Sequence, residues 1–209
     1  YAGYVTQTDY EIGRLLQAIR EEGKSSNTIV LWIFGDNGAN AQGGRLGFDA
    51  YGVNGRPRSV KDRLATAQDL GSAKFMNDYA AAWGWAESCP FQGAKVDAAH
   101  LGGTRDPLVI SWPARIKDVG GLRSQFSHIT DIAPTLYQVA GITPPAEVNG
   151  VKQMPLEGTS LRYTFDHPEA PSRHHIQYVE ARGNRAIYKD GWWAGEVVRE
   201  KWEPNGGVG

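Results

Sequence analysis

Three side chains in this 209-residue sequence combine types and positions that could do chemistry. Asp36 and Asn37 directly follow an apolar run, in WIFGDNGANAQGG, and Lys95 stands in PFQGAKVDAAHLGG. A carboxylate and an amide carbonyl are hard oxygen ligands of the kind that Ca²⁺ and Mg²⁺ take. A lysine could present a cation to an anionic substrate. Taken alone, Asp-Asn-Gly is also ordinary turn chemistry, and most lysines are solvated surface groups.

Four histidines are the other candidate groups in this sequence. His100 and His128 lie in the same part of the chain as Lys95, and His174 and His175 come at the start of an expected strand. A lone histidine is more often a packed or surface residue than a ligand. We therefore predict a structural role for all four, and no residue is assigned as the acid that protonates a leaving group.

The elements around the candidate residues have the order of an α/β protein. Residues 2–22 carry apolar side chains at helical spacing, and Gly23 suits the end of a helix. The run TIVLWIF, residues 28–34, is almost continuously apolar, which is typical of a strand buried on both faces of a parallel sheet. Asp36 and Asn37 would then lie at the carboxyl end of a strand, where ligands gather in open α/β sheets.

The middle of the chain contains a long irregular stretch followed by regular structure. Residues 38–94 are rich in glycine and arginine and lack strand periodicity, so we interpret them as a functional excursion. Residues 107–112 predict a short strand closed by a proline, and residues 131–140 predict a helix that ends at a glycine. The excursion would shape a pocket above the α/β scaffold.

The C-terminal part of the chain follows a different pattern. From His174 onward polar and apolar residues alternate, interrupted by a Gly-Asn and an Asp-Gly dipeptide. This pattern predicts an antiparallel hairpin or meander. We place a boundary near residue 165, which separates an α/β domain, residues 1–165, from the start of a small antiparallel subdomain, residues 166–209.

Composition excludes several classes of partner. The formal net charge is -1, so charge gives no argument for binding nucleic acid or an anionic membrane. No apolar run approaches the ~18 residues that a membrane-spanning helix needs. The single cysteine, Cys89, cannot form an intrachain disulfide. The sequence leaves the oligomeric state open.

Taken in order, these segments resemble the C-terminal portion of a type I sulfatase of the arylsulfatase kind. YAGYVTQTDYEIGRLLQAIREEGKSSNTIVLWIFGDNGA resembles the helix, the strand and the metal-binding Asp-Asn-Gly turn of that family. WGWAESCPFQGAKVDAAHLGGTRDPLVISWPARI resembles the segment with the active-site lysine, then Gly-Gly-x-Arg-x-Pro, then a strand ending in Trp-Pro. SQFSHITDIAPTLYQVAGI resembles the helix that follows, and GNRAIYKDGWWAG the first hairpin of the small C-terminal sheet.

The resemblance implies an alkaline-phosphatase-like fold, in which helices flank a mixed or parallel sheet and a small antiparallel C-terminal β subdomain follows. Asp36 and Asn37 match the two Ca²⁺ ligands that this turn supplies, with Mg²⁺ as the alternative ion. Lys95 matches the lysine that binds the sulfate oxygens. The implied reaction is hydrolysis of a small-molecule or carbohydrate sulfate ester by a formylglycine nucleophile, and the implied location is periplasmic or secreted.

Two parts of the family pattern are expected upstream of residue 1. The formylglycine motif is Cys-or-Ser, x, Pro, x, Arg, whereas Cys89 stands in Cys-Pro-Phe-Gln-Gly. The pair of aspartates that completes the metal site of the family is expected upstream as well. We therefore expect these 209 residues alone to hydrolyse no sulfate ester and to bind Ca²⁺ weakly.

Two other functions fit the same sequence. A phosphate monoester or diester hydrolase of the alkaline phosphatase superfamily would share the scaffold, although its two-zinc members prefer histidine where this chain has Asn37. A catalytically inactive homologue that binds sulfated glycans would use the arginines between residues 45 and 63. A solvated loop face is the plainer interpretation of those arginines.

Overall fold

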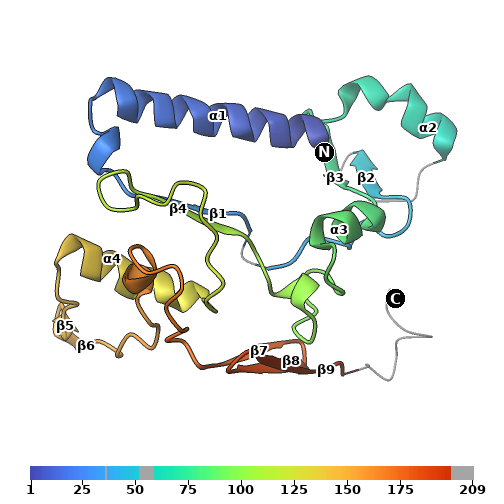
Figure 1. Ribbon diagram of the computed structural model, residues 1–209. Helices are drawn as coiled ribbons and strands as arrows, with labels where there is room; N and C mark the ends of the chain where they lie inside the picture. Colours follow the sequence, from blue (N-terminus) through green and yellow to red (C-terminus); the bar gives the residue numbers. More distant parts are fainter. Residues whose placement is uncertain (36, 52–58, 199–209) are drawn as a thin grey trace.

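The computed structural model describes residues 1–35, 37–51 and 59–198 of the chain (Figure 1). Asp36, one of the two predicted metal ligands, lies outside the described residues. Mixed helices and short strands make up the described chain, which confirms an α/β composition with small antiparallel sheets at the C-terminal end.

The first helix and strand form where the sequence predicts them. Helix α1 spans Ala2–Glu21, and Gly23 follows it at φ +69°, a left-handed conformation that glycine adopts without steric cost. A short 3₁₀ turn, η1 (Ser25–Asn27), leads into strand β1, which spans Val30–Ile33. The chain therefore leaves β1 immediately before the segment that carries Asn37.

Strand β4 spans Leu108–Ser111, within the strand predicted at residues 107–112. It pairs with β1. The ladder is antiparallel, and so is every other pairing among the described strands. The parallel pairing that we expected for β1 is thus not found in the described part of the chain. A continuous apolar run reports burial and not strand direction, and β1 itself is only partly buried.

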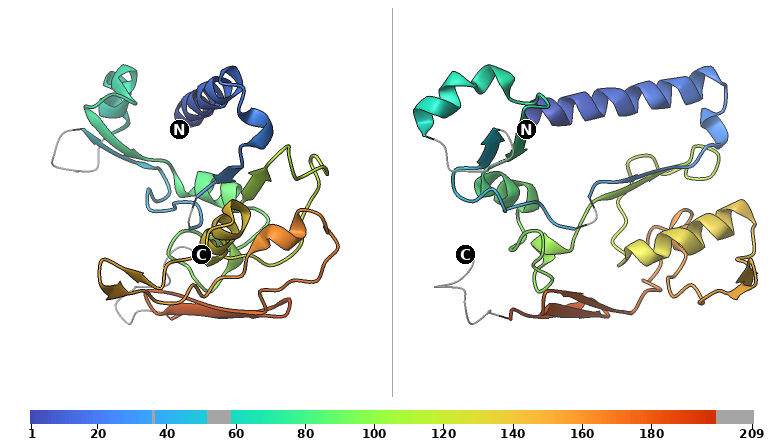
Figure 2. Two further views of the ribbon diagram at one scale, coloured as in Figure 1. Left: turned by 90° about the vertical axis from the view of Figure 1, so that its left-hand side faces the viewer. Right: turned by 180° about the vertical axis from the view of Figure 1, so that it is seen from behind.

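Helices lie on both sides of the β1–β4 ladder. Helix α4 spans Ile132–Ala140 and ends at Gly141 with φ +67°, close to the predicted bounds. A 3₁₀ turn, η4 (Ile129–Asp131), precedes it. In Figures 1 and 2, α1 lies on one side of the ladder and α4 on the other, with the C-terminal sheet beyond α4. This order gives the N-terminal part its layered α/β character.

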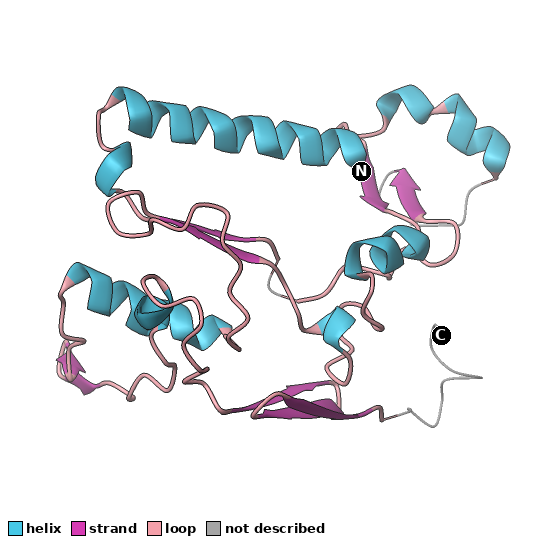
Figure 3. Ribbon diagram, viewed as in Figure 1, coloured by secondary structure: helices cyan, strands magenta, loops and turns pink. Residues whose placement is uncertain are grey.

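The stretch from residue 38 to residue 94 contains more regular structure than its pattern predicts. Strand β2 (Phe48–Tyr51) pairs with β3 (Phe75–Asp78). The stretch also contains two short helices, α2 (Val60–Ala65) between these strands and α3 (Ala81–Ser88) after them. Strands of four residues are too short to show alternation among so many glycines, which explains why they were missed. Figure 3 shows β2 and β3 as magenta arrows and α2 and α3 as cyan ribbons.

The C-terminal sheet has the predicted antiparallel topology. Its strands are β7 (Ile176–Ala181), β8 (Asn184–Lys189) and β9 (Trp192–Glu196), in the order β7-β8-β9. The first turn consists of Arg182 and Gly183, one residue earlier than the expected Gly-Asn pair, because Asn184 already belongs to β8. Between α4 and this sheet lie a small hairpin and a 3₁₀ helix, namely β5 (Glu147–Val148), β6 (Val151–Lys152) and η5 (Leu161–Thr164).

The chain has a small core and a large surface. Buried apolar side chains in the described residues are Ala98, Ala99, Leu161, Tyr163, Phe165 and Ala186. The accessible surface is 15391 Å², whereas a compact monomer of 22.9 kDa exposes roughly 9,600 Å². Much apolar surface therefore faces outward, including Tyr4, Leu15 and Val109. None of the described helices has the length and apolar character needed to cross a membrane.

Candidate active site

Two loops cross in backbone contact beside the carboxyl end of β1. The Gly38 N–H donates a hydrogen bond to the Gly103 carbonyl at 3.1 Å. A Cβ atom on Gly38 would lie 1.8 Å from the carbonyl oxygen of Gly102, so a side chain does not fit there. The crossing therefore depends on glycine, and it joins the loop after β1 to the loop that contains Lys95.

The crossing brings Asn37 and Lys95 to one pocket of about 480 Å³. The Lys95 N–H donates to the Ala39 carbonyl at 2.9 Å, which ties the lysine to the loop after β1. Further walls of the pocket come from Val96, Ala98, Gly103, Thr104, His128, Val179, Glu180, Ala181 and Arg182. Two of the three sequence-predicted site residues thus share a pocket, and the third, Asp36, lies outside the described residues.

Two residues that line the pocket adopt backbone conformations that are rare for their types. Val96 has φ +81° and Arg182 has φ +52°. The other described non-glycine residues with positive φ are Asn149 and Asp190, whose types tolerate this conformation. Val96 is β-branched and therefore strained, and strained residues cluster at functional sites.

The pocket also presents positive charge. Within the described part of the chain, neither the Lys95 ammonium nor the Arg182 guanidinium forms an ion pair or a side-chain hydrogen bond. The Glu180 carboxylate accepts a hydrogen bond from the Gly183 N–H at 2.6 Å, which closes the β7–β8 turn. Two cations are thus available to an anionic ligand in this pocket.

His128 lines the pocket, and we did not predict a site role for it from the sequence. Its Nδ1 accepts a hydrogen bond from the Thr130 N–H at 3.4 Å and lies 2.9 Å from the Thr130 hydroxyl, so the side chain caps η4. An accepting Nδ1 carries no proton, which places the proton of the neutral ring on Nε2. Burial lowers the pKa of His128, against the opposing charge of Asp131, and favours this neutral form.

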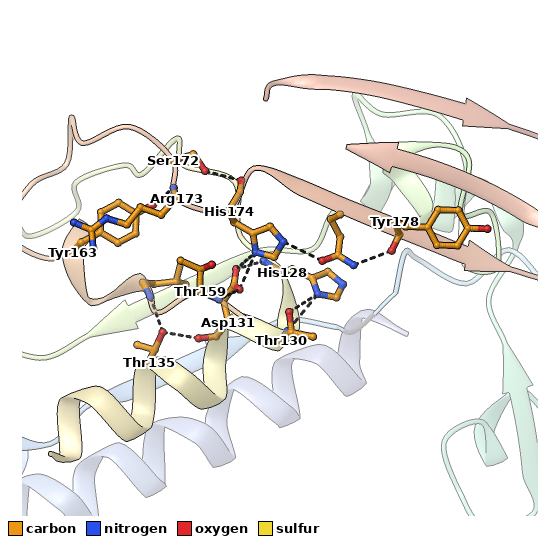
Figure 4. A network of polar contacts seen from close by, with 12 residues as sticks. His128, Thr130, Asp131, Thr135, Thr159, Tyr163, Ser172, Arg173, His174 and Tyr178 are labelled. Carbon is orange, nitrogen blue, oxygen red and sulfur yellow. Dashed lines mark hydrogen bonds and ion pairs between the residues drawn. The ribbon is translucent and has the colours of Figure 1, made fainter. Parts of the chain in front are cut away.

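A network of polar contacts around Asp131 holds the backbone of His128 in place (Figure 4). Asp131 is fully buried, and its carboxylate accepts hydrogen bonds from the His128 N–H at 2.8 Å and the Thr159 N–H at 2.7 Å. Both of its oxygens also lie 2.9 Å from Nδ1 of His174, which is buried. One carboxylate thus joins the start of α4, the loop before η5 and the segment before β7.

Gln177 provides a second polar contact to the ring of His174. The Gln177 amide nitrogen donates to the Tyr178 carbonyl at 2.8 Å, so its oxygen faces His174 Nε2 at 3.1 Å. Both ring nitrogens of His174 thus lie within hydrogen-bonding distance of a side-chain oxygen, one of Gln177 and one of Asp131. These contacts hold the His174 ring between the carboxylate of Asp131 and the amide of Gln177.

His100 and His175, two of the other candidate histidines, lie apart from the pocket lining. His100 Nδ1 lies 2.7 Å from an Asp97 carboxylate oxygen, and His175 Nδ1 lies 2.9 Å from that of Asp190 on the surface. Each has a local carboxylate partner. Their structural assignment stays a prediction.

The described residues offer only part of a metal site. Across residues 1–35, 37–51 and 59–198, no three His, Cys, Asp or Glu side chains are grouped closely enough to hold a metal ion. Asn37 lines the pocket, and its amide oxygen is a ligand that suits a hard cation. The Ca²⁺ prediction, which rests on Asp36 as well, stays a prediction.

The serine form of the formylglycine motif does occur once in the chain, as Ser-Trp-Pro-Ala-Arg from Ser111 to Arg115. Ser111 pairs with Val30, at the end of the β1–β4 ladder opposite to the one that leads toward the pocket. That end lies ~10 Å along the strand from the Ile33–Leu108 pair, and Ser111 does not line the pocket. This serine is therefore not placed to act on a ligand bound there.

A pocket beside a strand end that presents the Lys95 and Arg182 cations is chemically suited to an anionic ligand. A family model described as Sulfatase matches residues 1–142, and the chain belongs to the sulfatase family. The resemblance inferred from the sequence is thereby confirmed.

Two relatives show how much of a sulfatase this chain covers. It is 26% identical to an arylsulfatase of Klebsiella aerogenes over 184 residues. The matched region covers 88% of this chain and 37% of that relative. It is 30% identical to an uncharacterized sulfatase of Schizosaccharomyces pombe over 146 residues. That matched region covers 69% of this chain and 25% of the relative. The chain thus spans well under half the length of either relative.

Proposed function

We propose that this chain forms one side of the active site of an arylsulfatase-type sulfuric ester hydrolase. The observation that carries the proposal is that Asn37 and Lys95, far apart in the sequence, line one pocket. Membership of the sulfatase family supplies the reaction class. Because a relative is called an arylsulfatase, small aromatic sulfate esters are the first substrates to test.

Lys95 is proposed to bind the oxygens of the sulfate group. Its ammonium has no partner among the described residues and is a compact cation on a flexible stem. It would offset negative charge on the sulfate oxygens and would stabilise the transition state wherever that charge increases. His128, with its proton on Nε2, would offer a neutral hydrogen-bond donor in the same pocket.

Ca²⁺, with Mg²⁺ as the alternative, is proposed to bind through the Asn37 amide oxygen together with Asp36. Such an ion would polarise the sulfate group and stabilise its negative charge. The formylglycine nucleophile is proposed to come from outside these residues, since Cys89 departs from the motif and Ser111 does not line the pocket.

The test compares two lysine variants of the full-length protein, with 4-nitrophenyl sulfate as substrate in the presence of Ca²⁺. Lys95→Ala is expected to lower kcat/KM by about 10- to 100-fold, the loss typical of a hydrogen bond from a charged group. Lys117→Ala is the control, because that ammonium donates to the Pro113 carbonyl at 2.7 Å and does not line the pocket. Equal losses in both variants, or a preference for 4-nitrophenyl phosphate, would refute the proposal.

The metal proposal has its own measurement. Asn37→Ala is expected to weaken Ca²⁺ binding to the full-length protein by about tenfold or more, as measured by isothermal titration calorimetry. Asn40→Ala is the control, because the Asn40 amide bonds to Asp78 at 3.0 Å and does not line the pocket. Unchanged Ca²⁺ affinity in Asn37→Ala would remove this residue from the ligand set.

A further inference from the structure

Arg182 occupies a turn position that its residue type suits poorly. With Gly183 it forms the two-residue loop between the paired residues Ala181 and Asn184, and the two φ angles are +52° and +84°. Two consecutive positive φ angles define the hairpin turn that favours Asn-Gly, Asp-Gly or Gly-Gly. An arginine there is conformationally less favourable than an asparagine, so the turn itself does not explain the residue.

Other contacts hold this turn in place, and none of them uses the arginine side chain. The Glu180 carboxylate accepts the Gly183 N–H at 2.6 Å. The Trp193 indole of β9 donates to the Ala99 carbonyl at 2.8 Å, which fixes the C-terminal sheet against the loop that contains Lys95. The sheet thus holds Arg182 at a defined place on the pocket wall.

Arg182 and Lys95 reach the pocket from different segments, and neither cation has a partner within the described part of the chain. The proposed function assigns Lys95 to the sulfate group that is cleaved. A guanidinium can donate two parallel N–H bonds to a carboxylate or a sulfate, so Arg182 suits a second anionic group. A pocket of about 480 Å³ has room for a ligand larger than one sulfate group.

We propose that Arg182 is a specificity-determining residue that binds a second anionic group of the substrate. The preferred substrate is then a sulfate ester that also carries a carboxylate or a second sulfate. This inference rests on the proposed sulfatase function, and it separates the group that is cleaved, at Lys95, from the group that is only recognised, at Arg182.

The test compares esters with one and two anionic groups on the full-length protein. The probes are phenyl sulfate, the 2-, 3- and 4-sulfooxybenzoates, and the benzenediol disulfates. At least one ester with two anionic groups is expected to show a kcat/KM about tenfold above that of phenyl sulfate. The sulfooxybenzoate and disulfate series distinguish a carboxylate from a second sulfate as the recognised group.

Arg182→Asn is the decisive variant, because asparagine suits the left-handed turn and a retained melting temperature will show that the fold persists. The ratio of kcat/KM for the preferred ester to that for phenyl sulfate is expected to fall by about tenfold. Arg182→Lys is expected to keep part of the ratio, because it retains the charge without the planar fork. Arg185→Gln is the matched control, since this β8 arginine pairs with Glu196 at 2.6 Å outside the pocket.

The outcomes separate this inference from the function on which it rests. If the ratio in Arg182→Asn stays within about twofold of the wild-type ratio, the inference is overturned and the sulfatase function stands. A wild-type protein that prefers phenyl sulfate to every ester with two anionic groups overturns it as well. Absence of turnover on all of these esters overturns the proposed function, and the inference with it.

Discussion

At the scale of single residues, the pocket combines charge with constrained backbone. Lys95 carries the charge, and its neighbour Val96 is held at φ +81°. A left-handed conformation costs an L-residue roughly 1–2 kcal/mol, which the packing and hydrogen bonds of the surrounding loops must offset. The constraint fixes the direction in which the chain leaves Lys95, and it therefore limits where the ammonium can reach.

A pH dependence follows from His128. Burial lowers its pKa below the ordinary value of 6.5, so the unfolded chain takes up a proton at a higher pH than the folded chain does. The free energy of unfolding therefore falls as the pH drops from about 6.5 to the lowered folded value, and this contribution is fully present above that range. Protonation of Nδ1 also removes the acceptor of the Thr130 N–H.

His128→Asn tests this dependence, because asparagine keeps a capping oxygen but does not titrate. Urea unfolding between about pH 7.5 and pH 5 is expected to show a shallower loss of stability in the variant than in the wild type. The same slope in both proteins would mean that another group is responsible.

At the scale of elements, the site depends on the crossing of two loops and less on the sheet that leads to it. Gly38 allows the loop after β1 to touch the backbone of Gly102. The atoms that a side chain on Gly38 would meet belong to the backbone of Gly102 and Gly103. Backbone atoms cannot move aside as the end of a flexible side chain can. The relative position of Asn37 and Lys95 is thus determined by main-chain contact.

Gly38→Ala is expected to destabilise the protein by about 2 kcal/mol or more, because its Cβ would lie 1.8 Å from the Gly102 oxygen. Gly13→Ala is the matched control, since nothing lies within 4 Å of that position inside α1. The control is expected to gain about 0.5–1 kcal/mol from helix propensity. Urea unfolding measures both changes, and similar stability in the two variants would refute the close crossing.

The sequence predicted those elements whose signals are local. The helix that became α1, with Gly23 after it, and the strand within residues 28–34 were placed correctly because spacing and end signals lie within the segment itself. The direction of β1 could not be predicted, since it depends on a partner some 80 positions away. The positions of His128 and Arg182 in the pocket could not be predicted for the same reason, because their place beside Lys95 depends on contacts between distant segments.

At the scale of the whole molecule, the chain exposes far more surface than a compact protein of its mass. Its 15391 Å² compares with roughly 9,600 Å², and large apolar side chains such as Tyr4 and Leu15 contribute to the difference. Exposed apolar surface of this extent is typical of faces that other parts of a protein cover. The chain also matches only 37% and 25% of the lengths of the two relatives described above.

Residues 1–209 produced alone are therefore expected to turn over no 4-nitrophenyl sulfate, to bind Ca²⁺ weakly, and to bind a dye that reports exposed apolar surface. Enzyme assay, calorimetry and dye fluorescence measure the three properties on one preparation. Turnover that Lys95→Ala abolishes would contradict the prediction, because it would place a nucleophile within these residues.

The buried carboxylate of Asp131 has a consequence for how the molecule unfolds. Its bonds to His128, Thr159 and His174 link segments on both sides of the boundary predicted near residue 165. Releasing the C-terminal sheet would leave this charge buried without its partner, which is costly. We therefore expect α4 and the β7–β9 sheet to open as one cooperative unit, with similar protection of their amides in native-state hydrogen exchange. The boundary in architecture would then not be a boundary in cooperativity.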